Sequence, residues 1–459
     1  MLMMNSVFSE TDNLAFIHNL CETYAEDNAL SLDPRQNPNV KRGLRNEDGT
    51  GVMAGYTQIG SVRGYSIMDG ERVPMEGHLI YRGYDIMDLI HGYAEEKRFG
   101  FEEVVYLLLF GKLPNQAQYD KFCEILLGCM SLPPNFTEDM ILKQPSRNIM
   151  NKLARAVLAL YSTDEDPDNL ALENIIRQCI ELVARFPMIV AHAYAVKRHY
   201  FDYDSLYLHR PKPGLSLAEN FLHAIRNDQR FTEQEARLLD LCLVIHAEHG
   251  GGNNSTFACR VLSSTGTDTY SAISAAVGSL KGPKHGGANR QVMAQFEEIK
   301  KNVHNWDNDD EVASFLRRIL RKEVCDHTGL IYGMGHAIYT LSDPRAVVLK
   351  QNARSLAEKT GHLEEFQLLE AVERLTPQVF AEVTGNEKAM CANVDLYSGL
   401  VYQMMNIPPE LFTPLFAIAR VSGWCAHRIE EVMTGGRIIR PAYKSVAPKQ
   451  LYVPMTQRQ

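Results

Sequence analysis

The sequence HAEHGGGNNSTF at residues 246–257 and the sequence GPKHGGAN at residues 282–289 place two histidine–glycine elements within one short span. Glycine has no side chain, so the backbone beside each histidine can come close to a bound group. His285 lies between a proline and two glycines, on a loop whose backbone groups could hydrogen-bond a ligand; a histidine that caps a helix would give the same pattern. The fold has to bring this span to a place where a ligand can reach it.

A helix that is apolar on almost every side leads into the first element. Its last residues read LLDLCLVIH, and Thr232 with Glu235 three positions later has the pattern of a helix-capping box. Such a helix must be buried. We therefore expect its end to deliver three titratable side chains to the interior of a large core, namely those of His246, Glu248 and His249.

The composition is that of an ordinary globular protein. With 45% apolar and 22% charged residues, 459 residues suffice for two domains with a substantial shared core. The formal net charge of -9, from 47 basic and 56 acidic residues, argues against a nucleic-acid or anionic-membrane partner, because neither would be attracted electrostatically. An anionic substrate would have to meet a local cluster of arginine and histidine.

Three features favour a cytoplasmic protein. The nine cysteines include no Cys-x-x-Cys pair and lie mostly in apolar helical stretches, so we expect them to be reduced. Residues 1–13 carry two acidic residues and no basic residue, which suits neither a secretory signal nor a basic transit peptide. We expect no membrane-spanning helix, since the apolar run at residues 104–110 is typical of the longest.

The apolar pattern predicts a mainly α fold. The only convincing β signal is at residues 49–83, near the N-terminus, where short alternating runs flank an Asp69-Gly70 turn. No repeat, Walker loop or dinucleotide fingerprint is present in the sequence. Among the helices that we expect are those at residues 16–32, 101–110, 271–280, 292–303, 312–320 and 366–375.

Further candidate residues each have an alternative structural explanation. His336 lies in a glycine-flanked loop, which alone is a weak signal. Asp395 is an acid among apolar neighbours and could equally be the N-cap of the helix that follows it. Arg420 lies in an apolar helix, where a guanidinium needs an anionic partner, either a substrate or a structural glutamate. Arg437 and Arg440 could form a solvated basic patch.

A metal site is a weaker interpretation of the first element. His246 and His249 lie one helical turn apart beside Glu248, but the His-Glu-x-x-His spacing is absent and no second cluster of cysteine or histidine accompanies them. We therefore expect no metal and favour an organic anion as the ligand.

Seven segments in one order closely resemble the citrate synthase family. The resemblance covers residues 49–441, and Glu248 stands where that family often has aspartate. Several motifs in one order argue against chance similarity. The segments are YRGYDI, HAEHGGGNNSTF, GPKHGGAN, GMGHAIY with DPRA, NVDLYSG, ARVSGWCAHRIEE and RIIRP, at residues 81–86, 246–257, 282–289, 333–346, 393–399, 419–431 and 437–441.

The resemblance implies an acyltransferase that condenses acetyl-CoA with oxaloacetate and water to citrate and CoA, the entry step of the tricarboxylic acid cycle. Matching positions make Asp395 the base that removes a proton from the methyl group, with His285 hydrogen-bonded to the thioester oxygen. His336 would polarise the oxaloacetate ketone and protonate the new alkoxide. Acetyl-CoA is a co-substrate in this family, and no permanently bound cofactor is implied.

Family positions also match binding residues. The oxaloacetate carboxylates are matched to His246, Arg345, Arg420 and Arg440. In the family the residue matching Arg440 reaches the active site of the neighbouring subunit, which implies a homodimer. The adenine of CoA is held by a loop backbone, and the residues that match this cofactor-binding segment are Leu330, Ile331, Gly333, Met334, Gly335 and Asn393.

The family architecture implies a large helical domain at residues 1–286 and 407–459 and a small helical domain at residues 287–406. The site would then lie between the domains, and we expect oxaloacetate to drive their closure.

Three alternatives stay open. 2-Methylcitrate synthase uses propionyl-CoA with the same residues, and one extra methylene is worth only about 1–3 kcal/mol in a pocket. A citrate-cleaving enzyme would need an ATP-binding domain, for which the sequence shows no phosphate loop. A noncatalytic helical or metal-binding module is the third, and the intact catalytic positions argue against it.

Overall fold

The computed structural model describes residues 15, 18, 19, 21, 40–46, 50–69, 71–443, 445 and 449–458. Packing divides the chain into two units, Met1–Gly55 and Tyr56–Gln459. In the first unit, a 3-10 turn at Arg42–Leu44 precedes an antiparallel bridge between Arg45 and Gly51. Apart from a few single positions, the helix expected at residues 16–32 lies outside the described residues.

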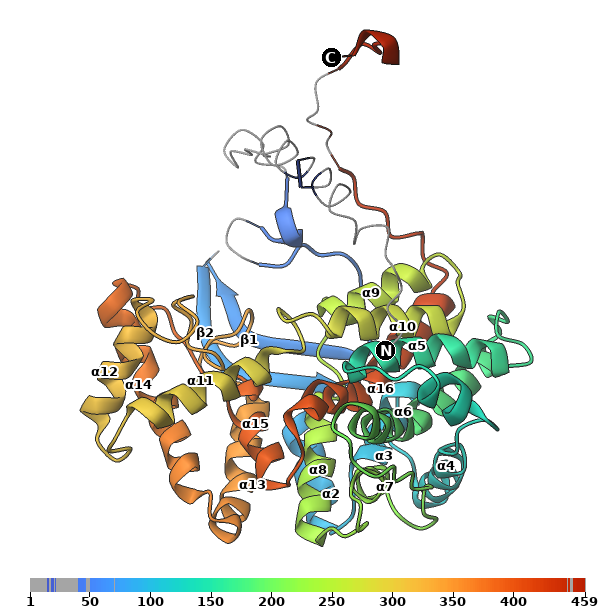
Figure 1. Ribbon diagram of the computed structural model, residues 1–459, viewed down its shortest axis with the longest axis horizontal. Helices are drawn as coiled ribbons and strands as arrows, with labels where there is room; N and C mark the ends of the chain where they lie inside the picture. Colours follow the sequence, from blue (N-terminus) through green and yellow to red (C-terminus); the bar gives the residue numbers. More distant parts are fainter. Residues whose placement is uncertain are drawn as a thin grey trace. The chain divides into compact units, whose positions relative to one another are not determined.

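The second unit is mainly helical, which confirms the predicted fold class (Figure 1). Its helices are α2 (Ile86–Glu95), α3 (Phe101–Phe110), α4 (Gln116–Gly128), α5 (Ile149–Leu160), α6 (Leu172–Phe201), α7 (Leu217–Ile225), α8 (Glu233–His246), α9 (Asn254–Ser263), α10 (Thr269–Leu280), α11 (Ala288–Asn302), α12 (Asp309–Leu320), α13 (Pro344–Thr360), α14 (Leu363–Thr384), α15 (Val394–Met404) and α16 (Phe412–Met433). Shorter helical turns are Thr137–Leu142, Tyr161–Thr163, Pro409–Leu411 and Met455–Gln457.

The predicted β element is a three-stranded antiparallel sheet. Its strands β1 (Gly60–Met68), β2 (Glu71–Tyr81) and β3 (Tyr84–Asp85) are neighbours in that order. Asp69 has a φ of +53°, a left-handed conformation that suits the tight turn between β1 and β2. Tyr81 ends β2 and donates its hydroxyl proton toward the carbonyl oxygen of Val244 (3.0 Å), which ties the sheet to α8.

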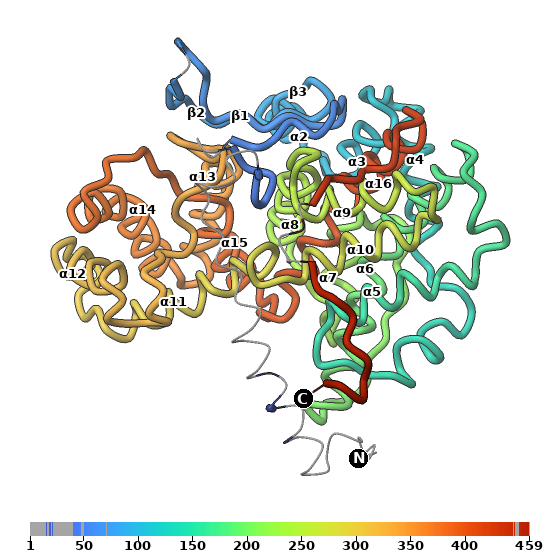
Figure 2. Tube along the Cα trace, turned by 90° about the horizontal axis from the view of Figure 1, so that it is seen from above, coloured from blue at the N-terminus to red at the C-terminus, as the bar shows by residue number. Residues whose placement is uncertain are grey.

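Helix α16 is central to the core. It packs against α3, α6, α8 and α9, and Arg420, Trp424 and Arg428 on this helix are among the largest fully buried side chains. Figure 2 shows α8, α9, α10 and α16 close together, with α11 to α15 grouped to one side. The predicted boundaries of a large and a small domain stay a prediction.

Helix α6 corrects one expectation. By length and composition this 30-residue helix could cross a membrane, whereas the sequence led us to expect no such segment. Arg185 and His192 interrupt its apolar run, which is why the sequence alone did not suggest it. Because 67% of its most apolar window is buried and it packs against α5, α7 and α16, its character is that of a core helix.

Candidate active site

The end of α8 carries buried polar side chains, as the sequence predicts. The helix begins with the predicted capping box, in which Thr232 Oγ1 accepts a hydrogen bond from the backbone N–H of Glu235 (3.2 Å) and Glu235 Oε2 accepts one from Thr232 (2.7 Å). It ends at His246, and the exposed fractions of His246, Glu248 and His249 are 1%, 0% and 9%. Polar groups buried in this way need polar partners or a ligand.

His246 has a structural partner. Its Nδ1–H donates to the carbonyl oxygen of Cys242 (2.7 Å), and its ring packs edge-on against Phe416 at a centroid distance of 4.7 Å. Burial, together with the charge of Arg345, lowers the pKa of His246 to about 3, so the imidazole is neutral at pH 7. In this form Nε2 can only accept a hydrogen bond.

Arg420 is fully buried in α16. Its Nε–H donates to the carbonyl oxygen of His246 (2.6 Å), and its guanidinium carbon lies 4.6 Å from the ring centroid of Phe416. Neither Nη1 nor Nη2 has a hydrogen-bond partner among the described residues. Burial lowers the pKa of Arg420 to about 10, partly offset by Glu248, so the group is a cation at pH 7. It thus presents two charged, unsatisfied donor groups.

Arg428, two turns along α16, also has two unpaired guanidinium nitrogens among the described residues. Its third donates to the carbonyl oxygen of Thr267, and its electrostatic neighbours are cysteines and Asp268 rather than any predicted site residue. An unpaired arginine therefore does not by itself mark the site, and the neighbours of Arg420 decide the matter.

His249 is a residue that the sequence did not single out from its neighbours. Its Nε2 is buried without a hydrogen-bond partner among the described residues. Its ring lies edge-on to that of His336, with centroids 5.3 Å apart, and 5.7 Å from the ring of Tyr339. Burial, with Arg345 nearby, holds the pKa of His249 well below its usual range. His249 thus offers a buried ring nitrogen that a ligand could satisfy.

The glycine-flanked loop fixes the tautomer of His336. Its Nδ1 accepts hydrogen bonds from the backbone N–H groups of Ile338 and Tyr339, both at 3.1 Å. An Nδ1 that faces two donors carries no proton, so in the neutral ring the proton is on Nε2. His336 can therefore donate a hydrogen bond through Nε2.

Ser255 fixes the tautomer of His285 in the opposite sense. The backbone N–H of Ser255 donates to His285 Nε2 (3.3 Å), and Ser255 Oγ lies 3.0 Å from the same atom while accepting from the indole N–H of Trp424 (3.2 Å). Burial lowers the pKa of His285 to about 4, with Arg420 adding to the effect. The neutral ring thus keeps its proton on Nδ1, which leaves a donor for a ligand.

Asp395 lies at the start of α15, but it is not the N-cap. Asn393 takes that role, because its side-chain oxygen accepts the backbone N–H of Asp395 (3.0 Å). The alternative reading of Asp395 as a helix cap is therefore wrong. Burial raises the pKa of Asp395 to about 6, although Arg345 opposes the shift. A carboxylate with this pKa is a stronger base than an ordinary aspartate and is still ionised at pH 7.

The segment before His336 is bonded to the segment before Asp395. The backbone N–H of Gly335 donates to the carbonyl oxygen of Cys391, and the N–H of Asn393 donates to that of Gly333, each at 2.8 Å. The side chain of Asn393 adds a bond to the carbonyl oxygen of Gly335 (2.9 Å). Gly333 has a φ of +84°, and a Cβ there would lie 2.9 Å from Leu396, so a side chain would separate the two segments.

Arg345 is held by Asp343 at the start of α13. Its Nε and Nη2 donate to the two carboxylate oxygens of Asp343 at 3.0 and 2.7 Å, and Asp343 also caps the helix. Asp343 Oδ2 accepts the backbone N–H of Val394 as well (3.2 Å), which links α13 to α15. Arg345 is thus a rigid cation, and its remaining nitrogen, Nη1, makes no hydrogen bond to a described residue.

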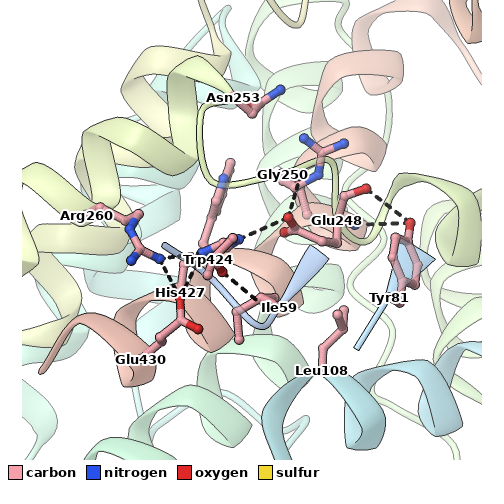
Figure 3. A network of polar contacts seen from close by, with 12 residues as sticks. Ile59, Tyr81, Leu108, Glu248, Gly250, Asn253, Arg260, Trp424, His427 and Glu430 are labelled. Carbon is pink, nitrogen blue, oxygen red and sulfur yellow. Dashed lines mark hydrogen bonds and ion pairs between the residues drawn. The ribbon is translucent and has the colours of Figure 1, made fainter. Parts of the chain in front are cut away.

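A buried network of polar contacts lies next to Arg420. Figure 3 shows this network from Tyr81 through Glu248 to His427. Glu248 Oε1 accepts from His427 Nε2 (2.9 Å), and Arg260 Nη1 donates to His427 Nδ1 (2.7 Å). Arg260 continues the network to Glu430 (2.8 Å). Glu248 makes no direct hydrogen bond to Arg420 among the described residues. His427 keeps the pKa of Glu248 low despite burial, so Glu248 is charged and its negative charge stabilises the Arg420 cation.

The charge of Arg420 affects titratable groups on different elements. Arg420 acts on the pKa of His285, His249 and Asp395, which follow α10, follow α8 and begin α15 respectively. Arg440 is exposed on the segment after α16 and makes no hydrogen bond or ion pair with any of them within the described chain. Among the described residues, no group of three His, Cys, Asp or Glu side chains is arranged to hold a metal ion.

Comparisons with known proteins identify the family of this chain. A family model described as citrate synthase, C-terminal domain, matches residues 48–442. A citrate synthase from Synechocystis is 36% identical over 391 residues, which is 83% of this chain and 89% of the relative. A 2-methylcitrate synthase from Shewanella oneidensis is 32% identical over 382 residues, covering 83% of this chain and 92% of the relative.

Solved structures agree as well. The citrate synthase of Thermoplasma acidophilum, solved as a ternary complex with carboxymethyl coenzyme A and oxaloacetate, superposes with a TM-score of 0.75 at 27% identity and covers 92% of this chain and 100% of its own. With the family model spanning most of the sequence and curated relatives that share more than 30% of its residues, the chain belongs to the citrate synthase family of acyltransferases.

Proposed function

We propose that the protein uses acetyl-CoA as its acyl donor and that Arg420 binds a carboxylate of oxaloacetate. The observation that carries the carboxylate assignment is the buried guanidinium of Arg420, whose two amino groups have no hydrogen-bond partner among the described residues, as is also true of Nε2 of nearby His249. A planar cation with an imidazole beside it suits a carboxylate. The Nη1 nitrogen of Arg345 offers a place for the second carboxylate. His246 supports the site because its carbonyl oxygen accepts a hydrogen bond from Arg420.

Three groups divide the proton transfers in the proposed reaction. Asp395 takes a proton from the carbon next to the thioester, while the Nδ1–H of His285 donates a hydrogen bond to the thioester oxygen, where negative charge develops. The resulting enolate carbon attacks the ketone carbon of oxaloacetate. The Nε2–H of His336 polarises that ketone and passes its proton to the new alkoxide, and water then cleaves the thioester to release CoA as a thiol.

The raised pKa of Asp395 and the neutral histidines support this division. A carboxylate with a pKa of about 6 is matched to work near neutral pH, and two neutral imidazoles with fixed tautomers can donate without first losing a proton. The backbone of Leu330, Ile331, Gly333, Met334 and Gly335, with Asn393, is the proposed seat of the CoA adenine, in a loop that Gln295 braces through Leu330 O and Tyr332 N.

A homodimer would complete the site with Arg440. The segment that follows α16 exposes large apolar side chains, among them Ile438 at 61%, Tyr443 at 96% and Leu451 at 85%. Exposed apolar side chains gathered along one segment favour burial against a partner. A second copy of the chain would cover them and receive Arg440, as the family resemblance implies.

Free-thiol release tests the proposed donor. The purified protein is given oxaloacetate with acetyl-CoA or with propionyl-CoA, each against a blank without oxaloacetate. We expect release that requires oxaloacetate and is faster with acetyl-CoA. Faster release with propionyl-CoA would favour 2-methylcitrate formation, the activity that one relative's name carries. No release with either donor would overturn the proposal.

A further inference from the structure

The hairpin of β1 and β2 contains an irregularity on the side of His336. Arg63 pairs with His78 and Tyr65 pairs with Pro74, so the single residue Gly64 on β1 faces three residues, 75–77, on β2. A bulge of this kind leaves backbone groups without partners in the strand ladder and bends the hairpin.

Those unpaired groups bond to the loop that follows His336. Thr340 Oγ1 accepts the backbone N–H of Met75 (3.2 Å) and lies within donor range of the carbonyl oxygens of Gly64 and Met75. Ser342 Oγ accepts the backbone N–H of Gly77 (3.0 Å). Thr340 and Ser342 therefore replace the strand partners that the bulge removes.

Two glycines allow the loop to dock this closely. A Cβ on Gly64 would lie 2.5 Å from Cα of Tyr339, and a Cβ on Gly77 would lie 2.2 Å from the carbonyl oxygen of Ser342. Both neighbours are backbone atoms, which cannot move aside as a flexible side chain can. Even one methyl group at either position would push residues 338–342 away from the hairpin.

The docked residues lie between two groups of the proposed site. Ile338 and Tyr339 supply the two N–H groups that keep Nδ1 of His336 unprotonated, and they are the residues against Gly64. At the other end, Pro344 lies against Gly77 and immediately precedes Arg345. A shift of this loop would therefore disturb both the tautomer of His336 and the placement of Arg345.

We propose that the bulge between β1 and β2 positions His336 and Arg345 by holding the loop at residues 338–342, with Gly64, Gly77 and Thr340 as positioning residues. We call this docking site for the loop the seat. This inference rests on the proposed roles of His336 and Arg345 in the condensation. The hairpin touches no substrate in this account. It acts by holding the backbone that sets the histidine tautomer.

The substitution Thr340→Val tests the seat with little change in volume. It removes the hydroxyl that joins both strands to the loop, and we expect kcat to fall about tenfold or more, because small misplacements of catalytic groups are costly. Thr340→Ser keeps the hydroxyl and should restore most of the loss. Thr384→Val is the matched control, since that exposed hydroxyl donates to Phe380 within α14 and accepts the backbone N–H of Asn386, and neither residue belongs to the proposed site.

Nitrogen chemical shifts of the His336 ring distinguish a positioning role of Thr340 from an effect on protein stability alone. In protein labelled with 15N-histidine, with His336 assigned by its absence in His336→Gln, we expect one tautomer in the wild type and a mixture in Thr340→Val. Unchanged shifts and unchanged kcat in Thr340→Val would overturn the proposal. The shifts report on the seat even if the wild type released no CoA, so failure of the seat and failure of the proposed function can be told apart.

The substitution Gly77→Ala tests the proposal independently. We expect it to lower kcat and to raise the KM for oxaloacetate through Arg345, whereas Gly92→Ala, where a Cβ meets no atom within 4 Å, should leave both unchanged. Wild-type kinetics in a folded Gly77→Ala variant would contradict the seat.

Discussion

Arg420 and Asp395 are both charged at pH 7, although burial disfavours the charged form of each side chain. The guanidinium stays charged although two of its nitrogens have no partner among the described residues, and the carboxylate ionises only above a pKa of about 6. Groups that cost stability in this way are typical of functional sites. The sequence identified both residues, but the buried Nε2 of His249 could be found only from the structure, because His246 and His249 have the same pattern in the chain.

Replacement of Arg420 by leucine should weaken oxaloacetate binding by about a hundredfold, since a desolvated charge-assisted hydrogen bond to a carboxylate is lost. Isothermal titration of the folded variant measures this directly. Arg428→Leu is the matched control, because Arg428 is also buried on the same helix but its main electrostatic neighbours are cysteines and Asp268. Equal affinity of the wild type and Arg420→Leu would contradict the carboxylate role.

The rate should depend on pH through Asp395. The base must be ionised, so kcat/KM should fall about tenfold per unit as the pH drops below about 6, the pKa that burial gives this carboxyl. The pKa of His285 is about 4, so this histidine stays neutral across that range and does not add a second titration to the profile. A rate profile from pH 5 to 8 that stays flat below pH 6 would argue against Asp395 as the base.

At the scale of elements, the helices that carry the site were largely predictable, and their ends less so. The capping box of α8 and its apolar run gave its start and end, because both signals are local. Helix α14 continues past the predicted end at residue 375 to Thr384, across Pro377 inside it, since packing overrides the preference of proline for helix ends. The bulge that seats Thr340 joins residues far apart in the chain, so no local pattern could show it.

The close approach of α16 to the end of α8 depends on Gly423. A Cβ there would lie 2.4 Å from Glu248 Oε2 and 2.5 Å from the carbonyl oxygen of Ala247. Gly423→Ala should therefore lower the free energy of unfolding by about 3 kcal/mol through overpacking. Urea denaturation measures the change, with Gly278→Ala in α10, where a Cβ meets no atom within 4 Å, as a control of little effect. Equal stability of the two variants would contradict the close packing.

At the scale of the whole molecule, one chain does not assemble every residue that the family resemblance assigns to the site. Arg440 lies on an exposed segment among exposed apolar side chains, whereas Arg420 is buried and acts electrostatically on His285 and Asp395. A single sequence marks such a residue only through resemblance, because no property of the chain itself shows where a partner would place it. The proposed homodimer makes that placement testable.

Mixed subunits test the sharing of Arg440. Asp395→Asn and Arg440→Leu should each be nearly inactive alone, while co-expression should restore about a quarter of the wild-type activity, because half of the dimers are mixed and each mixed dimer holds one intact site. The measurement is oxaloacetate-dependent CoA release by the co-purified mixture. Activity no greater than that of the separate variants would exclude exchange of Arg440 between subunits.

The measurement that tests the central claim most directly is made on Asp395→Asn. The variant keeps the shape of the side chain but cannot accept the proton from the acyl donor. We predict that oxaloacetate-dependent release of CoA from acetyl-CoA falls about a thousandfold while the affinity for oxaloacetate, measured on the same sample by calorimetry, stays within about twofold of the wild type. Release at a near-normal rate would contradict the assignment of Asp395 as the base and with it the proposed mechanism.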